Sequence, residues 1–335
     1  MAGRRRPLGA WRVLAGATVF GALASCTGTL DAGTDAHGLL PVDGRNPVIM
    51  YNDSASDNWS GEYAVLLAQS SGPPLAGIIV TGSSYWPDVT SNTKGWNDLL
   101  TAAESSGISN LPAVTVSTGK PLVRPADGQI LSTAKNDSPG AQLIVNLSRQ
   151  LSLPWRPVVI LADTQLTDVA DAYLIDPSVV DRVVVVAALG TYTAPNGAMN
   201  PPNGELDPWA DWIVAQVFQY IQVSAFYDQT GDVTAADVPN LPQTALGKEM
   251  AAKQPNLLTI TTASDKVSVL AVGLSKFVAA VQQASVDTTA AFDSTQGPPL
   301  VPNPKGNVLI VTQIQAPLAM SCLWQLLLGS GTCNA

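Results

Sequence analysis

The 335-residue sequence carries 26 acidic and 17 basic residues, which gives a formal net charge of −9. An acidic surface repels the phosphates of nucleic acids and of anionic lipids, so the charge argues against a nucleic-acid-binding function. The length suits one large α/β domain, or at most two.

The first 25 residues have the pattern of an export signal. A basic segment, MAGRRRPLGAWR, precedes a short apolar segment, VLAGATVFGALAS, which is too short for a comfortable membrane span. The residues LASC, which end at Cys26, resemble the cleavage box of bacterial lipoproteins, in which the cysteine receives the lipid. An ordinary secretory cleavage site is the alternative.

These patterns predict a lipoprotein signal peptide in residues 1–25, a flexible tether in 26–46 and a single α/β domain in 47–335. We therefore expect an exported protein of the bacterial cell envelope that contacts the membrane only through its N-terminal lipid. Loss of residues 1–25 removes four Arg and no acid, so the net charge becomes −13. In an oxidising compartment, Cys322 and Cys333 are expected to form a disulfide that pins the C-terminal helix.

Strand-like and helix-like segments alternate along the rest of the chain. The predicted strands are continuous apolar runs rich in Val and Ile, which is typical of strands covered on both faces. They occupy residues 47–53, 75–82, 112–118, 156–164, 181–190, 220–228 and 307–314. Helices are predicted in residues 59–70, 93–106, 138–151, 166–175, 207–218 and 318–329. This order predicts a doubly wound, mostly parallel sheet flanked by helices, with the Pro-rich residues 297–307 as a surface connection.

Polar residues gather where predicted strands end and helices begin. In doubly wound folds ligands bind at this edge, beyond the carboxyl ends of the strands. The side chains offer carboxylate, amide and hydroxyl oxygens without His or Cys, a set that suits Ca²⁺ or Mg²⁺ better than Zn²⁺ or copper. Turn formation and helix capping are the simpler explanation. The main candidates are Asp53, Asp57, Asn58, Asp163, Thr167, Asn196, Asn203 and Asp265.

The order of these segments resembles the nucleoside hydrolase (inosine/uridine-preferring N-ribohydrolase) family. The family opens with a strand that ends in Asp-x-Asp-x-x-x-Asp-Asp, and residues 51–58 read YNDSASDN. Its Leu-Thr-Asn segment is similar to residues 166–168 (LTD), and its Asn-x-x-x-Asp-Pro segment is matched by residues 203–208 (NGELDP). Its C-terminal His-Asp pair looks like Ser264 and Asp265. The resemblance covers residue 47 to about residue 280.

The resemblance implies calcium-dependent hydrolysis of an N-glycosidic bond in a nucleoside or a similar sugar-containing ligand. Asp53 would then be both a metal ligand and the general base that takes a proton from water. The other calcium ligands would be Asn58, the carbonyl group of Thr167, and Asp265. The sugar hydroxyls would bind to Asp57, Asn203 and Asn196.

The sequence departs from the family pattern at three positions. Tyr51 and Asn58 replace acids, and Ser264 replaces the family histidine; the only His of the chain, His37, lies in the predicted tether. Glu62, one helical turn after Asn58, could restore the missing charge, although a solvated helix face is the simpler expectation. The alternative function is therefore a catalytically impaired relative that binds a sugar-like ligand or a protein partner at the cell surface.

Overall fold

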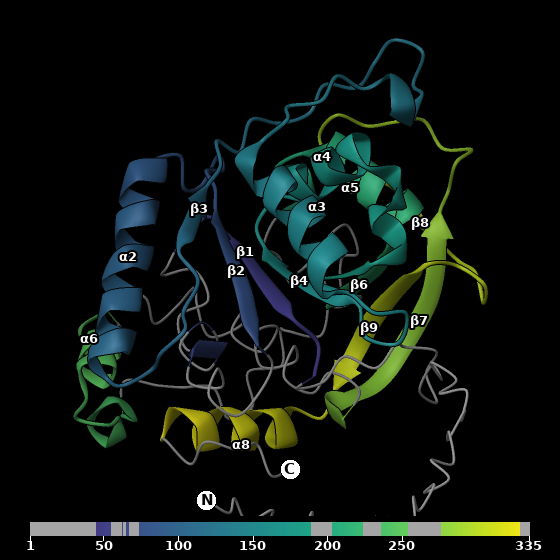
Figure 1. Ribbon diagram of the computed structural model, residues 1–335. Helices are drawn as coiled ribbons and strands as arrows, with labels where there is room; N and C mark the ends of the chain where they lie inside the picture. The colour runs from purple at the N-terminus through teal and green to yellow at the C-terminus, as the bar shows by residue number, and fades with distance from the viewer. Residues whose placement is uncertain are drawn as a thin grey trace, which may run out of the picture. The chain divides into compact units, whose positions relative to one another are not determined.

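A nine-stranded sheet forms the centre of the domain (Figure 1). The computed structural model describes residues 45–54, 62, 65–66, 74–188, 203–223, 236–253 and 276–328. The strand order is β3-β2-β1-β4-β5-β6-β9-β7-β8. The strands are β1 (Val48–Asn52), β2 (Leu75–Val80), β3 (Val114–Val116), β4 (Val158–Asp163), β5 (Val183–Ala188), β6 (Gln219–Val223), β7 (Val278–Val286), β8 (Leu300–Pro302) and β9 (Val308–Ile314).

Strand β1 lies inside the parallel part of the sheet, between β2 and β4. Its last residue, Asn52, is in register with Val80 at the end of β2 and with Asp163 at the end of β4. The carboxyl ends of these strands are therefore level. The residues that follow them meet at one edge of the sheet, as the doubly wound prediction requires.

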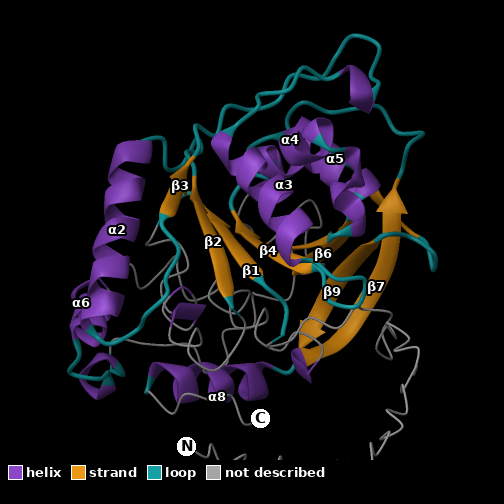
Figure 2. Ribbon diagram, in the orientation of Figure 1, coloured by secondary structure: helices purple, strands orange, loops and turns teal. Residues whose placement is uncertain are grey.

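Helices cover both faces of the sheet (Figure 2). Because side chains alternate along a strand, Ile49 and Tyr51 face one layer of the core while Val48 and Met50 face the other. The first layer receives residues from α3 (Pro139–Leu151), α4 (Thr167–Ile175) and α5 (Pro208–Val217). The second receives residues from α2 (Val89–Ser105), α6 (Ala245–Lys253) and α8 (Ala316–Leu327). The prediction of a doubly wound, mostly parallel sheet is confirmed.

Two of the described α-helices begin with a capping residue followed by proline. The Ser138 hydroxyl accepts a hydrogen bond from the Ala141 backbone N–H, and the Asp207 carboxylate accepts one from the Ala210 N–H. Both caps satisfy backbone donors that have no partner inside the helix, and a proline in the next position costs no hydrogen bond. These signals place the starts of α3 and α5 close to their predicted positions.

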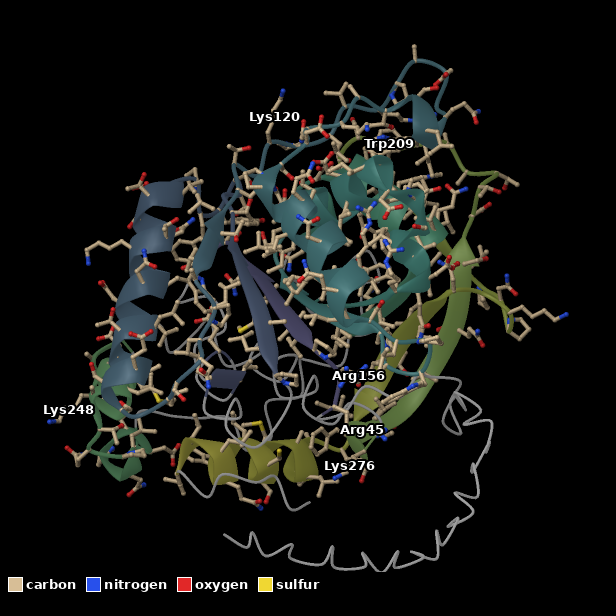
Figure 3. All side chains as sticks on the ribbon, in the orientation of Figure 1. Arg45, Lys120, Arg156, Trp209, Lys248 and Lys276 are labelled. Carbon is tan, nitrogen blue, oxygen red and sulfur yellow. The ribbon has the colours of Figure 1, made fainter. Side chains whose placement is uncertain are left out.

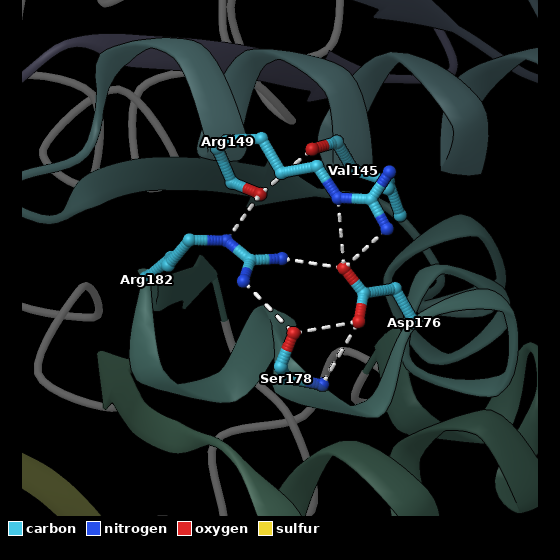
Figure 4. A network of polar contacts seen from close by, with 6 residues as sticks. Val145, Arg149, Asp176, Ser178 and Arg182 are labelled. Carbon is cyan, nitrogen blue, oxygen red and sulfur yellow. Dashed lines mark hydrogen bonds and ion pairs between the residues drawn. The ribbon is translucent and has the colours of Figure 1, made fainter.

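A polar network joins α3 to the 3₁₀ helix η2 (Pro177–Asp181), which leads into β5 (Figure 4). Asp176 Oδ2 accepts hydrogen bonds from Arg149 Nη2 at 2.8 Å and from Arg182 Nη2 at 2.7 Å. Its Oδ1 accepts from the hydroxyl and the backbone N–H of Ser178. These charge-assisted bonds hold the pKa of Asp176 well below its ordinary value, with the Ser178 hydroxyl contributing most.

The antiparallel end of the sheet was not predicted. Strand β7 pairs antiparallel with both β8 and β9, and β8 lies within residues 297–307, so the expectation of a plain connection there is wrong. Many β7 side chains are only partly buried, and the strand includes Gln282 and Gln283. It therefore lacks the continuous apolar pattern of a strand covered on both faces.

No helix in the described ranges has the length and apolar content of a membrane span.

Candidate functional site

Asp53 lies at the edge where the strands β1, β2 and β4 end. It follows the last residue of β1 directly, and only 2% of its surface is exposed. Its Oδ1 atom is buried and has no hydrogen-bond partner among the described residues. A buried carboxylate oxygen without a partner carries a desolvation cost, which a bound cation or a ligand donor would offset.

Burial also changes the protonation of Asp53. It raises the pKa of the carboxyl group from 3.8 to about 6, because the charged form loses its hydration. The hydroxyls of Ser83, after β2, and Thr164, after β4, favour the charged form and oppose the rise. None of the ion pairs among the described residues involves Asp53. The hydroxyls beside the Asp53 carboxylate are thus neutral, and the carboxylate of Asp163 lies at the adjoining end of β4.

Asn52 and Glu62 form a second buried pair at the end of β1. Asn52 Nδ2 donates to Glu62 Oε1 at 3.0 Å, and Asn52 Oδ1 accepts from the backbone N–H of Ser54. Glu62 is fully buried, so the expectation of a solvated helix face is wrong. The Asn52 amide provides a polar partner that makes the burial of Glu62 possible. The Asn52 side chain fixes the backbone next to Asp53 through Ser54.

Gln165 holds the loops at this edge together. Its Nε2 donates to the carbonyl of Gly82 at 3.1 Å, after β2, and to the carbonyl of Gly119 at 2.6 Å, after β3. Gly119 has a φ of 63° and lies so close to Gly82 that a Cβ atom would clash with the Gly82 carbonyl. Glycine satisfies both demands. One buried amide thereby ties β4 to the loops that follow β2 and β3.

Thr167 begins α4, as predicted, and its side chain binds Asp207. Thr167 Oγ1 donates to Asp207 Oδ2 at 2.6 Å, and the same oxygen accepts the backbone N–H of Leu122 at 2.9 Å. Because Asp207 also caps α5, it joins α4, α5 and the loop between β3 and α3. Burial raises the pKa of Asp207, although all of these donors favour the charged form. Asp207 therefore fixes the orientation of the Thr167 side chain.

Tyr51, which the sequence resemblance aligns with the first acid of the family motif, has a side chain that belongs to the core. The residue is fully buried, and its hydroxyl accepts the backbone N–H of Asp168 at 3.3 Å. The Asp168 carboxylate accepts the Ser117 hydroxyl at 2.8 Å and lies against Gly140, at the start of α3. Burial raises the pKa of both Tyr51 and Asp168. A phenol thus supports the first turn of α4 where the family has a carboxylate.

Several predicted site residues lie outside the described residues. These are Asp57, Asn58, Asn196, Ser264 and Asp265, together with the predicted lipidation residue Cys26 and the predicted disulfide partner Cys333. Asn203 is described: it is partly buried and begins the short 3₁₀ helix η3 (Asn203–Glu205). Cys322 is fully buried in α8, and its pairing stays a prediction. The convergence of Asp53, Asp57 and Asp265 also stays a prediction.

The chemistry of the described residues suits a hard cation. Asp53 contributes a buried carboxylate oxygen without a hydrogen bond, and Thr167 contributes oxygens at the adjoining strand end. Carboxylate and carbonyl oxygens are the groups that Ca²⁺ prefers. Within the described ranges, no group of three or more His, Cys, Asp or Glu is arranged to hold a metal. The other predicted metal ligands, Asn58 and Asp265, lie outside those ranges.

A doubly wound α/β protein with a buried, oxygen-rich carboxyl edge is the class that these features define. Among solved structures, the chain is similar to an inosine-uridine preferring nucleoside hydrolase from Bacillus anthracis, with a TM-score of 0.60, 13% identity and coverage of 84% of this chain and 99% of that chain. It is also similar to a plant nucleoside hydrolase, with a TM-score of 0.59, 15% identity and coverage of 84% and 98%. It is similar as well to a nucleoside hydrolase-related protein from Saccharophagus degradans, with a TM-score of 0.55, 17% identity and coverage of 87% of this chain and 73% of that chain.

The fold is therefore nucleoside-hydrolase-like, at low sequence identity. No protein-family model matches the sequence, and no curated protein matches it significantly. The sequence-based site lacks the residues that support it, chiefly Gln165, the Asp168 carboxylate and the Asn52 amide that binds Glu62. The sequence did indicate the capping role of Asp207, because an acid followed by proline is a typical helix start.

Proposed function

We propose that the protein hydrolyses an N-glycosidic bond in a nucleoside or a similar substrate, with calcium as its cofactor. The observation that carries the proposal is the position of Asp53. Its buried, unpartnered Oδ1 lies at the carboxyl end of β1 in a nucleoside-hydrolase-like fold. This edge is where doubly wound proteins bind ligands.

Each predicted residue has a role in this reaction. Calcium would be held by Asp53, Asn58, the carbonyl group of Thr167, and Asp265. A bound divalent ion supplies a water molecule of lowered pKa and a positive charge near the sugar. Asp53 would accept one proton of the attacking water, whose oxygen bonds to the sugar carbon while the bond from that carbon to the base nitrogen breaks. The released base would take a proton from solvent. Asp57, Asn203 and Asn196 bind the sugar hydroxyls and orient the ring.

The surroundings of Asp53 support its role as a base. Burial raises the pKa of Asp53 to about 6, and a cation bound to the carboxylate would lower this pKa and keep the group ionised, the form that accepts a proton. The hydroxyls of Ser83 and Thr164, after the adjoining strands, favour the charged form of this carboxylate. Asp207 orients the first turn of α4 through the Thr167 hydroxyl and is a positioning residue in this proposal.

A hydrolysis assay on the full-length protein tests the proposal. The protein is incubated with inosine and with uridine, in calcium and in chelator, and the released ribose is measured. We expect ribose release only with calcium, and a loss of about 10²–10⁴-fold in Asp53→Asn, the usual contribution of a general base. Asp98→Asn, which makes the same change on the exposed face of α2, is the matched control. Equal release by the wild type and Asp53→Asn would contradict the proposal.

A non-catalytic binding protein is the second candidate function, and Tyr51 favours it. Its phenol fills the position of the first family acid and is part of the core, so that carboxylate is missing. Such a protein would bind a sugar-like ligand or a partner at the cell surface without turnover. A nucleoside that shifts the melting temperature while no ribose is released would support this function over the first.

The proposed location is the bacterial cell envelope, with a lipid on Cys26 and residues 26–46 as the tether. The export pattern of residues 1–25 supports this location. Mass spectrometry of the protein from bacterial membranes tests it. A lipid-modified N-terminal peptide that begins at Cys26 is expected, and an intact residue 1 in the mature protein would contradict it.

A further inference from the structure

A pocket with a volume of about 440 Å³ opens between the β3–α3 loop, α5 and the β7–β8 loop. Figure 3 shows Trp209, one of its lining residues, close to the loop that follows β3. None of the residues assigned above to the metal or the substrate lines this pocket. Its volume lies in the range of small-molecule sites. The pocket is therefore a separate candidate binding site, which we call the aromatic pocket.

Three aromatic rings form its wall. The rings of Trp209 and Trp212 lie nearly parallel, with centroids 6.4 Å apart, and Phe292 packs edge-on against both. Each indole is fixed by a hydrogen bond: Trp209 Nε1 donates to Thr133 Oγ1, and Trp212 Nε1 donates to Gln216 Oε1. Trp209 and Trp212 are only 3% and 9% exposed, so they form a rigid backing for Phe292, the partly buried ring that a ligand can contact.

Arg124 supplies a cation at the same wall. Its guanidinium carbon lies 5.4 Å from the ring centre of Trp209 and 5.1 Å from that of Phe292. Stacking uses the flat face of a guanidinium group and leaves the N–H groups on its edge available for a planar anion. The charge of Arg124 helps to lower the pKa of Asp127, but the Asp127 oxygens accept hydrogen bonds from the Gln129 N–H and the Ser132 hydroxyl rather than from Arg124. No hydrogen bond of the guanidinium occurs among the described residues.

The remaining polar groups of the lining are neutral. They are the side chains of Gln129, Gln216 and Thr288, and the lining includes no Asp or Glu, although the chain has 26 acids. Since Gln216 Oε1 accepts from Trp212, its amide nitrogen remains as a donor. A cation and hydroxyl-binding amides beside an aromatic wall match a ligand that combines a carboxylate, hydroxyls and a ring.

We propose that the aromatic pocket binds an acidic monosaccharide of the uronic-acid type. The sugar carboxylate pairs with the edge of the exposed Arg124 guanidinium, and the apolar face of the sugar ring packs on the accessible part of Phe292. The hydroxyls bind to the side chains of Gln129, Gln216 and Thr288. This site does not depend on the proposed hydrolase activity, because it shares no residue with it.

Isothermal titration of the full-length protein tests the proposal. The probes are D-glucuronate and D-galacturonate, with D-glucose as the neutral match and benzoate as an aromatic carboxylate without hydroxyls. We expect saturable binding of at least one uronate, and binding at least ten-fold weaker for both glucose and benzoate. Quenching of tryptophan fluorescence should follow the same titration, since two indoles line the pocket.

Two substitutions locate the binding. Arg124→Gln should weaken uronate binding at least ten-fold by removing the cation. Gln216→Glu should have a similar effect, because it keeps the acceptor for Trp212 but repels a carboxylate. Gln216 is exposed, so this variant tests the site even if Arg124→Gln fails to fold. Lys305→Gln, which removes an exposed cation that is not part of the lining, should bind as the wild type does. The proposal is overturned if neither uronate binds at millimolar concentration, if benzoate binds as tightly, or if Gln216→Glu leaves binding unchanged.

Discussion

The carboxylate of Asp207 accepts the hydroxyl of Thr167 at 2.6 Å, and this contact connects the starts of two helices at the candidate site. The same carboxylate caps α5 and accepts the Leu122 backbone N–H. The side chain of Thr167, a predicted calcium ligand, is therefore held by Asp207, a residue 40 positions away in the sequence. The residues that position the candidate site therefore come from several elements along the carboxyl edge of the sheet.

Replacing Asp207 by Ala should destabilise the protein by about 2–4 kcal/mol. The change removes a helix cap and leaves buried donors without an acceptor, and these losses have typical costs of about 1 and 1–3 kcal/mol. Chemical unfolding followed by circular dichroism measures the effect. Asp98→Asn, on the exposed face of α2, should change stability by less than about 0.5 kcal/mol. An equally small effect of Asp207→Ala would show that the contacts of Asp207 contribute little.

Asp211 predicts a dependence of stability on pH. The residue is fully buried in α5, and among the described residues its Oδ1 accepts only the Tyr220 hydroxyl, at 3.3 Å. Burial raises its pKa from 3.8 to about 7. The folded state therefore holds this proton between pH 4 and 7 while the unfolded state releases it, so the contribution of Asp211 to stability falls as pH rises through that window.

Asp211→Asn removes this titration while it keeps an acceptor for Tyr220. The variant should be more stable than the wild type at pH 8, by an amount on the order of a few kcal/mol. The difference should shrink as pH falls towards 4. Urea unfolding at a series of pH values measures it, and a difference that does not vary with pH would contradict the prediction.

The low pKa of Asp176 predicts the opposite dependence of stability on pH. Its pKa is held low in the folded state by Ser178, Arg182 and Arg149, so its contribution is present above pH 4 and is lost as pH falls below that value (Figure 4). Asp176→Asn should cost about 1 kcal/mol at pH 7, since the pairs lie close to solvent and salt screens them. The cost should decrease in high salt. An effect of equal size at pH 3 and in high salt would exclude the ionic origin.

The sequence was sufficient to predict the parallel part of the sheet. The runs around Ile49, Ile160 and Val185 are apolar without interruption, because each of these strands is covered by helices on both faces. The strand that contains Gln282 and Gln283 gives no such signal, because it lies in the antiparallel end of the sheet and most of its side chains are only partly buried. Its partner, β8, is too short to be recognised in a Pro-rich segment.

The site was predictable only where local signals exist. Asp53 follows an apolar strand, and Thr167 opens an apolar helix, so the sequence indicated both positions. The burial of Glu62 depends on the Asn52 amide, and the role of Gln165 depends on carbonyl groups from two other loops. Contacts of this kind join residues that are separated along the sequence or on the far side of a turn, and a single sequence without a family model does not show them.

Calcium titration of the full-length protein tests the central claim most directly. The claim is that Asp53 and Asp265 share one cation site at the carboxyl edge of the sheet. Isothermal titration should show one calcium ion per wild-type chain, with binding at least ten-fold weaker in both Asp53→Asn and Asp265→Asn and unchanged in Asp98→Asn. Absence of binding at millimolar calcium, or equal binding by the wild type and both site variants, would contradict the account.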